Sequence, residues 1–430
     1  MSNPRRLILA TPGYPQLFGM LFVQIHSRPS PKSIVMEPFT IDIAQPILDD
    51  LKARISATRW TDEIEGAKWE YGTNRGYLDE LCHYWADGFD WKKQQDYLNS
   101  FRHFTATVSD IGLHFIYQKG EGNTAIPLLL THGYPDSFAR FLKIIPLLTK
   151  ADDKGVSFDV VIPSIPGYGF SEIPSKPGMN PQKIAGLFNS LMTEELGYKK
   201  YIAHGGDWGT SITEQIGLYH ADSLLGIHLT DVPFGHLFSI PKGEWSSDEK
   251  KYLDTGKQWQ QTEGAYAMIQ GTKPQTLGYG LNDSPVGLAS WIIEKFYTWS
   301  DNGGNIESTF SKDELLTHLT IYWATQTINS ANRLYFEAMK AIMQAMYNPL
   351  VKLNPFDKTG DRVEVPAAFA LFPKDLVNAP RGFAERIFNV VQWTTMPRGG
   401  HFAAMEQPEL LVADIRKFAN CLNSLGQENM

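Results

Sequence analysis

The chain of 430 residues is 43% hydrophobic and 20% charged, a composition typical of a soluble protein with a large core. Its length predicts either one large domain with an insertion or two domains. The formal net charge of -8 excludes the strongly basic balance expected of a protein that binds nucleic acid or an anionic membrane.

Cysteine is scarce in this sequence. Cys82 and Cys421 form neither a disulfide framework nor a metal-ligand spacing. They are compatible with a reducing compartment, and we expect a cytoplasmic protein. We also expect no metal and no cofactor. Aromatic residues make up 12% of the chain, which suits a protein with a large apolar pocket.

Residues 1–36 differ in pattern from the rest of the chain. Two short apolar runs, 7–10 and 17–25, are separated by Pro12 and Pro15. Neither run approaches the roughly 18 apolar residues that a membrane-spanning helix needs. We therefore expect a peripheral N-terminal extension, with a membrane anchor or a signal peptide as the alternative, and loose association with a membrane stays open.

Residues 37–103 predict a helical arm beside the main domain. Apolar and aromatic residues recur there at intervals of three and four, the spacing of one helix face. We expect this arm to be a scaffold without chemistry of its own. The residues that carry the periodicity are Ile47, Leu48, Leu51, Ile55, Tyr77, Leu78, Leu81, Tyr84 and Trp85.

Residues 104–230 predict the first part of a doubly wound, mainly parallel α/β sheet. Apolar and polar residues alternate in 104–108 and 113–117, as in half-buried strands. The runs 126–131 and 158–162 are continuously apolar, as expected of central strands buried on both faces. Because the intervening segments read as helices, functional loops should follow the carboxyl ends of the strands.

One stretch in this region has the pattern of a nucleophile elbow. An apolar strand leads into Gly205-Gly206-Asp207-Trp208-Gly209, and 210–220 is spaced as a helix. Glycines are needed there because the nucleophile occupies a strained strand-to-helix turn. Aspartate at this position favours alkyl substrates, since a carboxylate that attacks an sp3 carbon leaves an ester that water can cleave. The alternative is that Asp207 only caps the helix that follows it.

Residues 231–356 contain mostly helical, aromatic segments, including 245–259, 286–299 and 315–339, and no convincing strand. An insertion of this kind within an α/β sheet predicts a helical lid over the strand ends. The sheet should resume in residues 357–430, and an amphipathic helix should close the chain. The strands expected there are 365–372 and 390–396, and the helix is 408–422.

An acid and a histidine follow these last two strands. Asp375 lies just past the first strand and His401 just past the second, in Gly399-Gly400-His401-Phe402. The chain order of nucleophile, acid and histidine is that of α/β-hydrolases. The histidine can activate water while the acid fixes its tautomer. Taken singly, Asp375 is also typical of a turn and His401 of a loop.

At this point the chain resembles a known family, the α/β-hydrolase-fold epoxide hydrolases of the microsomal and fungal type with an N-terminal helical arm. The resemblance covers about residues 37–422. The motifs that carry it are His132-Gly133-Tyr134-Pro135, Gly205-Gly206-Asp207-Trp208-Gly209, Gly271-Thr272-Lys273-Pro274, Leu281-Asn282-Asp283-Ser284-Pro285 and Gly399-Gly400-His401-Phe402.

The resemblance implies a catalytic role for each matching residue. Asp207 matches the nucleophile, His401 the base and Asp375 the orienting acid, a place where microsomal relatives often have glutamate. Tyr266 and Tyr335 match the two lid tyrosines that protonate the epoxide oxygen, and Tyr322 is the fallback for the second. The backbone N–H groups of Tyr134 and Trp208 match the oxyanion donors. Residues expected to line the substrate site are His132, Pro135, Trp208 and Phe402.

The resemblance therefore predicts hydrolysis of a small apolar epoxide to a diol, with water as the second reactant. A haloalkane dehalogenase would use the same elbow and histidine but would not need two lid tyrosines. A biosynthetic enzyme that opens an epoxide with an internal hydroxyl could dispense with the ester. A silent ligand-binding relative is disfavoured by the intact triad, and a homodimer stays open.

Overall fold

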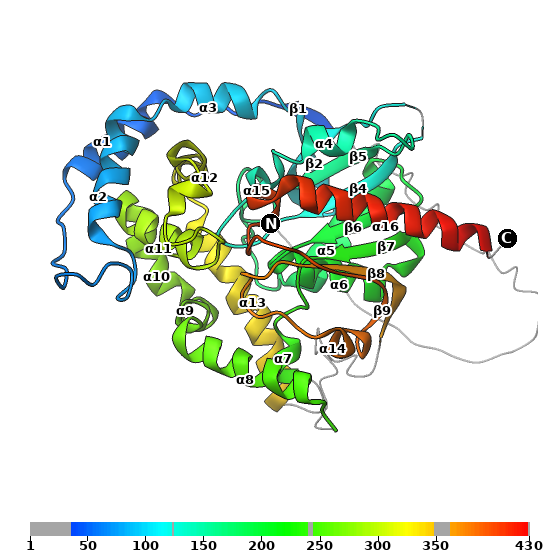
Figure 1. The fold of residues 1–430 in the computed structure, drawn as a ribbon. Helices are drawn as coiled ribbons and strands as arrows, with labels where there is room; N and C mark the ends of the chain where they lie inside the picture. The colour runs from blue at the N-terminus through cyan, green and yellow to red at the C-terminus, as the bar shows by residue number, and fades with distance from the viewer. Residues whose placement is uncertain (1–35, 123, 240–243, 348–361, 429–430) are drawn as a thin grey trace, which may run out of the picture. The chain divides into compact units, whose positions relative to one another are not determined.

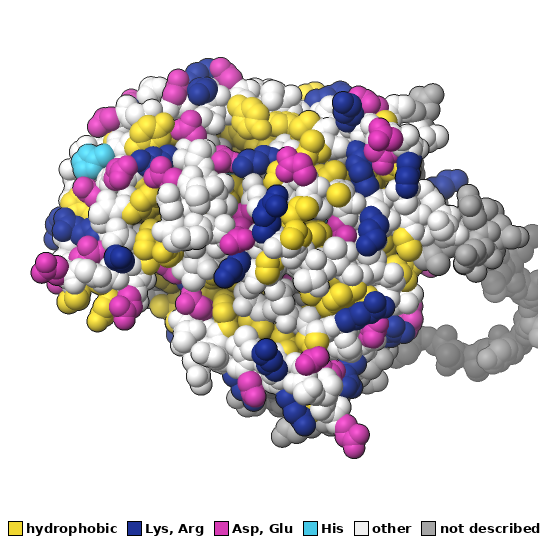
Figure 2. All heavy atoms as spheres, viewed as in Figure 1, with side chains coloured by type: hydrophobic (Ala, Val, Ile, Leu, Met, Phe, Trp, Pro, Cys, Tyr) yellow, Lys and Arg dark blue, Asp and Glu magenta, His cyan; other side chains and the backbone are white. Residues whose placement is uncertain are grey.

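The computed structural model describes residues 36–122, 124–239, 244–347 and 362–428. Residues 1–35 of the expected N-terminal extension thus lie outside the described part of the chain, as do the last residues of the predicted lid. Within the described ranges, no helix combines the length and the apolar character needed to cross a membrane. On the face shown in Figure 2, acidic and basic side chains are intermixed over the surface.

The described residues build one nine-stranded sheet, which Figure 1 shows at the centre of the fold. The strand order is β1-β2-β3-β5-β4-β6-β7-β8-β9, and every pairing from β5 to β9 is parallel. The predicted mainly parallel sheet is therefore confirmed. The strands are β1 (Glu37–Phe39), β2 (His103–Val108), β3 (Ile111–Gln118), β4 (Ile126–Thr131), β5 (Phe158–Pro163), β6 (Tyr201–Gly205), β7 (Leu224–Leu229), β8 (Val363–Leu371) and β9 (Phe388–Thr395).

Two hydrophobic cores cover the two faces of this sheet. Successive residues of a strand point to opposite faces, so Leu129 belongs to one core and Leu128 and Leu130 to the other. The first core contains side chains of α5 (Pro181–Ser190) and α6 (Trp208–Tyr219). The second contains those of α4 (Ile145–Thr149) and α16 (Pro408–Glu428), which crosses the sheet in red in Figure 1. Burial on both faces explains why the central strands are continuously apolar.

The helical arm consists of α1 (Gln45–Ser56), α2 (Arg75–His83), a π-helical turn (Tyr84–Gly88) and α3 (Trp91–Leu98). Asn74 and Asp90 cap α2 and α3 by accepting backbone N–H bonds. The arm packs on the helical insertion: the indole of Trp85 donates to Thr320 Oγ1 at 2.9 Å, and Arg54 binds Asp283 at 2.7 Å. In Figure 1 this blue segment lies beside α11 and α12. The arm therefore packs against the helical insertion and supports it.

Between β7 and β8, the secondary structure of the described residues consists of helices joined by turns and loops. Gln326 has a left-handed φ of 54° and divides the predicted helix 315–339 into α12 and α13. Pro274 and Pro285 each open a helix, because proline fixes a helical φ and lacks only an N–H that would be unpaired there. The helices are α7 (His236–Ser239), α8 (Ser247–Thr262), α9 (Ala265–Thr272), α10 (Pro274–Asp283), α11 (Pro285–Thr298), α12 (Lys312–Thr325) and α13 (Ile328–Tyr347).

Candidate active site

The turn between β6 and α6 holds Asp207 in a strained conformation, with φ 58° and ψ -126°. Positive φ is rare for residues other than glycine, and such strain concentrates at functional sites. A Cβ atom at Gly205 would collide with the carbonyl of Gly209, and one at Gly209 would collide with that of Thr131. The flanking glycines therefore allow the sharp turn that lifts the Asp207 carboxylate beyond the strand ends.

The loop after β4 supplies a backbone donor to this carboxylate. The N–H of Tyr134 donates to Asp207 Oδ1 at 2.8 Å. A Cβ atom at Gly133 would collide with the Asp207 side chain, so glycine is what permits this close approach. Trp208 is the first residue of α6, and its N–H is one of those at a helix start that have no acceptor within the helix. The two predicted backbone donors thus lie in the chain segments that meet at Asp207.

Asp375 and His401 come together beyond the ends of β8 and β9. His401 Nδ1 binds Asp375 Oδ1 at 2.7 Å, and His401 Nε2 lies 3.4 Å from Asp207 Oδ2. The His401 and Asp375 side chains are 2% and 3% exposed, so neither charge is well solvated. The structure therefore arranges the three side chains in line, with the imidazole between the two carboxylates.

The charges on both sides raise the pKa of His401. Burial alone disfavours the imidazolium, but the charge of Asp375, together with that of Asp207, outweighs it and raises the pKa of His401 to about 10. The resting site therefore holds an imidazolium at neutral pH. Any reaction that neutralises Asp207 removes part of this stabilisation and makes His401 more ready to release its proton.

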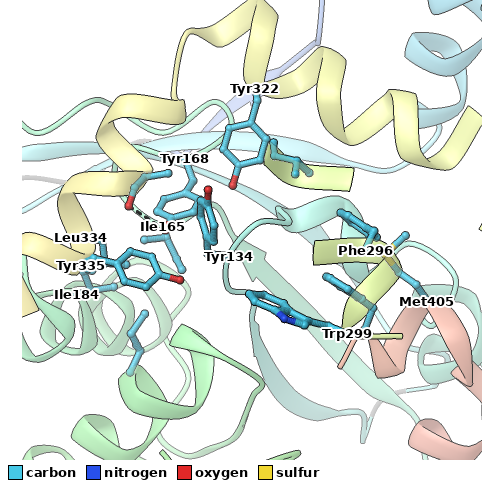
Figure 3. Close-up of a cluster of buried hydrophobic side chains, with 14 of the residues drawn as sticks. Tyr134, Ile165, Tyr168, Ile184, Phe296, Trp299, Tyr322, Leu334, Tyr335 and Met405 are labelled. Carbon is cyan, nitrogen blue, oxygen red and sulfur yellow. Dashed lines mark hydrogen bonds between the residues drawn. The ribbon is translucent and has the colours of Figure 1, made fainter. Parts of the chain in front are cut away.

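Tyr266 on α9 and Tyr335 on α13 face the same space from the helical insertion. The Tyr335 ring lies edge-on to Trp208, with centroids 4.7 Å apart, and to Tyr134 at 5.4 Å. The Tyr266 ring lies parallel to that of Tyr134 at 6.3 Å. Figure 3 shows Tyr134 and Tyr335 side by side, with Trp299 across from them. Both predicted lid tyrosines thus lie with the residues next to Asp207.

Burial raises the pKa of Tyr266 well above its ordinary value, and the charge of Asp207 raises it further. Burial also raises the pKa of Tyr335, with smaller contributions from Tyr266 and Asp207. Both phenols therefore keep their protons throughout the physiological pH range. Because Asp207 contributes to both shifts, neutralising its charge would make each tyrosine a stronger acid.

Tyr322 on α12, the alternative candidate for the second lid tyrosine, has different contacts from Tyr335. Its hydroxyl donates to the backbone carbonyl of Asp136 at 2.9 Å, and its side chain is fully buried. Its ring lies 6.4 Å from that of Tyr168. The phenol is thus engaged with the main chain, whereas Tyr335 lies against Trp208 beside Asp207.

The residues predicted to line the substrate site differ in their surroundings. His132 is fully buried, and its Nε2 accepts the N–H of Ile165 at 3.1 Å. Phe402 stacks on Phe296 with centroids 4.1 Å apart, and Pro135 follows Tyr134 through a cis peptide bond. Trp208 Nε1 is buried and has no hydrogen-bond partner within the described part of the chain. Contact of each of these side chains with substrate stays a prediction.

Glu406 is a residue of the site that the sequence did not indicate. Its carboxylate accepts backbone N–H bonds from Asp301 at 2.8 Å, Gly400 at 2.9 Å and Phe402 at 2.8 Å. The first donor belongs to the helical insertion and the other two flank His401. Glu406 therefore ties the histidine loop to the segment after α11. A glutamate at the end of a short helix carries no pattern that would have revealed this role.

Asp231, just after β7, also approaches the site unpredicted. Its Oδ1 accepts the hydroxyl of Thr210 at 2.5 Å and the N–H of Asp207 at 3.3 Å. Burial, followed by the charge of Asp375, raises the pKa of Asp231 to about 7. Its position after a strand that neighbours both β6 and β8 is the only signal in the sequence that could have found it.

The site thus combines a carboxylate at an elbow, a buried imidazole–carboxylate pair, backbone donors and two protonated phenols. Such a set can form and cleave an ester on Asp207 by nucleophilic attack, general acid and general base chemistry. Within the described residues, no three His, Cys, Asp or Glu side chains are grouped so that they could hold a metal ion.

Comparison with known families gives two matches. Residues 36–141 match the model described as "Epoxide hydrolase N terminus", which spans the helical arm and the loop after β4. Residues 126–273 match the model described as "alpha/beta hydrolase fold", which contains the elbow. Together the two matches span residues 36–273, just over half of the chain.

Curated relatives are similar over nearly the whole chain. Epoxide hydrolase 1 of Sus scrofa is 37% identical over 415 residues, which cover 90% of this chain and 89% of that protein. Juvenile hormone epoxide hydrolase 2 of Ctenocephalides felis is 35% identical over 405 residues, covering 88% of this chain and 84% of that one.

Solved structures agree with these matches. The crystal structure of juvenile hormone epoxide hydrolase from Bombyx mori superimposes with a TM-score of 0.78 at 29% identity, covering 91% of this chain and 95% of that one. The epoxide hydrolase of Aspergillus niger gives a TM-score of 0.76 at 28% identity, covering 91% and 97%. The predicted α/β-hydrolase fold is confirmed.

Proposed function

The chain belongs to the epoxide hydrolases of the α/β-hydrolase fold, and on this premise we propose that it opens an apolar epoxide to a vicinal diol through an ester on Asp207. The observation that carries the proposal is the line of Asp207, His401 and Asp375, with a backbone donor on the far oxygen of Asp207. This line supplies a nucleophile, a base for water and a place for the oxyanion.

In the first half-reaction, Asp207 Oδ2 attacks a ring carbon and the carbon–oxygen bond of the epoxide breaks. Oδ1 is held by the N–H of Tyr134 at 2.8 Å, so it becomes the carbonyl oxygen of the ester. Oδ2 faces His401 Nε2 at 3.4 Å, too long a contact to keep it from reacting. The nucleophile needs no base, because carboxylates are ionised near neutral pH.

Tyr266 and Tyr335 supply the proton that the departing oxygen needs. An alkoxide is a poor leaving group, and a positioned acid typically gains a factor of 10² to 10⁴ in rate. Both phenols are kept protonated by burial and by the charge of Asp207. As the ester forms, that charge disappears and the phenols become stronger acids at the moment when the alkoxide develops.

In the second half-reaction, His401 takes a proton from water, whose oxygen attacks Cγ of the ester. The oxyanion develops on Oδ1, next to the N–H groups of Tyr134 and Trp208, where each donor contributes roughly 3 kcal/mol. The intermediate then expels the second oxygen of the diol, which takes the proton of the new carboxyl group and leaves the Asp207 carboxylate. The proton that the His401 imidazolium releases in the ester state restores the tyrosine that was deprotonated in the first half-reaction. Since the ester lacks the charge that raises the pKa of His401, the imidazole can lose its proton at neutral pH in this state.

The aromatic surroundings favour an apolar substrate. The rings of Tyr134, Trp208, Tyr266, Trp299 and Tyr335 lie around the Asp207 carboxylate, and their centroids are within 6.5 Å of one another in adjacent pairs. A polar epoxide would lose its hydration there without gaining enough hydrogen bonds in return. The substrate class that fits is therefore a small apolar epoxide.

The family assignment favours an epoxide over a haloalkane as substrate. An enzyme that opens an epoxide with a hydroxyl of the same substrate, forming a cyclic ether, would not need the ester. Trapping the ester therefore distinguishes the covalent hydrolase from the cyclising enzyme.

The test is the variant His401→Gln mixed with an aryl or alkyl epoxide. Attack by Asp207 needs no base, whereas cleavage of the ester does, so the variant should react once and stop. Intact-mass analysis should show the protein heavier by one substrate mass. In the unaltered protein, one turnover in ¹⁸O-water should place label in Asp207, because water attacks the ester carbonyl.

The control is Asp207→Ala, which should acquire no added mass. An unmodified His401→Gln protein, together with ¹⁸O directly in the first diol formed, would mean that water attacks the epoxide itself. That result would overturn the covalent mechanism.

A further inference from the structure

A buried ion pair lies directly behind the catalytic loops. Arg140 Nη1 and Asp136 Oδ2 are 2.6 Å apart, and the two side chains are 2% and 0% exposed. Asp136 precedes a short 3-10 turn (Phe138–Phe141), and Arg140 lies within this turn. Burying two charges is costly, and an apolar pair of similar volume often stabilises a fold as well or better. Stability alone is therefore a weak reason for this pair.

The pair binds the main chain of two catalytic loops. Asp136 Oδ1 accepts the N–H of Gly133 at 3.1 Å, in the loop that carries the Tyr134 donor. Arg140 Nη2 donates to the carbonyl oxygen of His401 through a short hydrogen bond. The guanidinium and carboxylate thus connect the oxyanion loop to the histidine loop, which is 261 residues away along the chain from Arg140.

The same guanidinium also lies against the elbow. A Cβ atom at Gly206 would lie 3.1 Å from Arg140 Nη2, which is tighter than an ordinary contact. The position next to Asp207 is therefore packed on the Arg140 side chain. Arg140 touches the chain segments of both the nucleophile and the base while contacting neither reacting atom.

The backbone carbonyl of His401 is held by its hydrogen bond from Arg140. His401 donates its own N–H to the carbonyl of Trp299 at 2.9 Å, and Glu406 binds the N–H groups on either side. These contacts fix the donors of the loop. Within the described residues, Arg140 is the donor that the structure gives to the His401 carbonyl oxygen. Removing it frees the loop to rotate about its remaining bonds.

We propose that the Asp136–Arg140 pair is a positioning device, which fixes the His401 imidazole relative to the Tyr134 oxyanion donor for hydrolysis of the ester on Asp207. The inference rests on the proposed covalent mechanism. It concerns only the second half-reaction, because the attack by Asp207 Oδ2 and the proton transfer from the tyrosines do not use the imidazole as a base. Changing the pair should therefore slow the second half-reaction more than the first.

The test variant is Arg140→Lys, which keeps the charge and can bind Asp136 but cannot reach both partners with a planar fork. Formation and decay of the ester are followed by quenched-flow mass analysis with an aryl epoxide. Displacing a catalytic group by about 1 Å can cost on the order of 10²-fold. We expect ester decay about 10- to 100-fold slower than in the unaltered protein, and ester formation within about threefold of it.

A second variant guards against a folding defect. Asp136→Asn combined with Arg140→Met removes both charges and leaves no unpaired buried ion, so it should fold even though the loops are no longer connected. It should show the same slow decay of the ester. Circular dichroism and the thermal midpoint establish that each variant is folded before its rates are compared.

The matched control is Arg416→Lys on α16. Arg416 also binds backbone carbonyls, those of Leu147 at 2.7 Å and Lys150 at 2.6 Å, and lies 3.5 Å from Asp152. It contacts none of the catalytic loops. The variant should lose stability while the ratio of the two half-reaction rates stays unchanged.

The outcomes separate the inference from the function on which it rests. If His401→Gln forms no ester, the covalent mechanism fails and the inference fails with it. If His401→Gln forms the ester but the Arg140 variants slow both steps equally, or neither, the pair is only structural. An unequal effect in Arg416→Lys as large as in Arg140→Lys would also overturn the inference.

Discussion

Replacing Asp231 by asparagine should make the protein more stable at high pH and change it little at low pH. Burial raises the pKa of Asp231 to about 7, and the charges of Asp375 and Asp207 contribute, while Thr210 and His401 act in the opposite direction. Asparagine keeps the Oδ1 that accepts the bonds of Thr210 and Asp207. The substitution therefore removes the charge and preserves the acceptor.

The direction of this pH dependence follows from the linkage between proton binding and folding. The pKa of Asp231 is higher in the folded protein than in the unfolded chain, so the folded state binds the proton more tightly. The stability that this binding provides is complete below about pH 4 and is lost as the pH rises to about 7. A difference of about three pKa units corresponds to about 4 kcal/mol as an upper bound. The residue as a whole is only half-buried, so screening by solvent reduces the effect to about 1–2 kcal/mol.

The assay is urea unfolding of both proteins at about pH 5 and about pH 8. The advantage of Asp231→Asn should grow with pH. Asp152→Asn is a control of opposite sign: although burial opposes its ionisation, backbone N–H bonds from Val156 and Lys154 and the nearby Arg416 lower the pKa of Asp152. That variant should lose stability by a similar amount at both pH values, because both lie above the pKa of Asp152 in the folded and in the unfolded chain. An advantage of Asp231→Asn that is equal at both pH values would refute the reasoning.

Other substitutions test the roles of the catalytic side chains. Asp207→Ala should abolish diol formation and leave the thermal midpoint nearly unchanged, and turnover within about tenfold of the unaltered protein would exclude Asp207 as the nucleophile. Tyr266→Phe and Tyr335→Phe should each slow ester formation by roughly 10²-fold in single-turnover experiments, and normal rates would make the tyrosines mere packing. Asp375→Asn should slow ester decay by roughly 10²-fold or more. It should also lower the pKa of His401 from about 10, which histidine NMR can measure. An unchanged His401 titration would contradict Asp375 as the partner of this histidine.

The sequence predicted most strand positions, because hydrophobic periodicity and burial are properties of a few neighbouring residues. The continuous apolar runs became β4 and β5, buried on both faces, within one residue of their predicted ends. The strands predicted at 365–372 and 390–396 begin two residues earlier in the structure, as β8 and β9. Periodicity and burial act over a few residues, and a single sequence displays them directly.

The elements that the sequence missed are those that local pattern does not encode. β1 has three residues, too few for any alternation, and exists because it pairs with β2, more than 60 residues later. The helix predicted at 315–339 is divided at Gln326, whose left-handed backbone no local signal indicated. α10 begins at Pro274, which suits a helix start but suits a turn equally.

The sequence alone predicted the chemistry that we propose for this protein, because residue type and strand-end position are local properties. Glycines around Asp207, and an acid and a histidine after later strands, already predicted a nucleophile, an orienting acid and a base. Only the tertiary structure decided how these groups are held and charged. Asp231, Glu406 and the Asp136–Arg140 pair act through contacts with loops that are distant in the chain, and the pKa of His401 depends on two carboxylates brought to it by folding. Such contacts arise from the packing of parallel strand ends at one edge of the sheet, which no short stretch of sequence records.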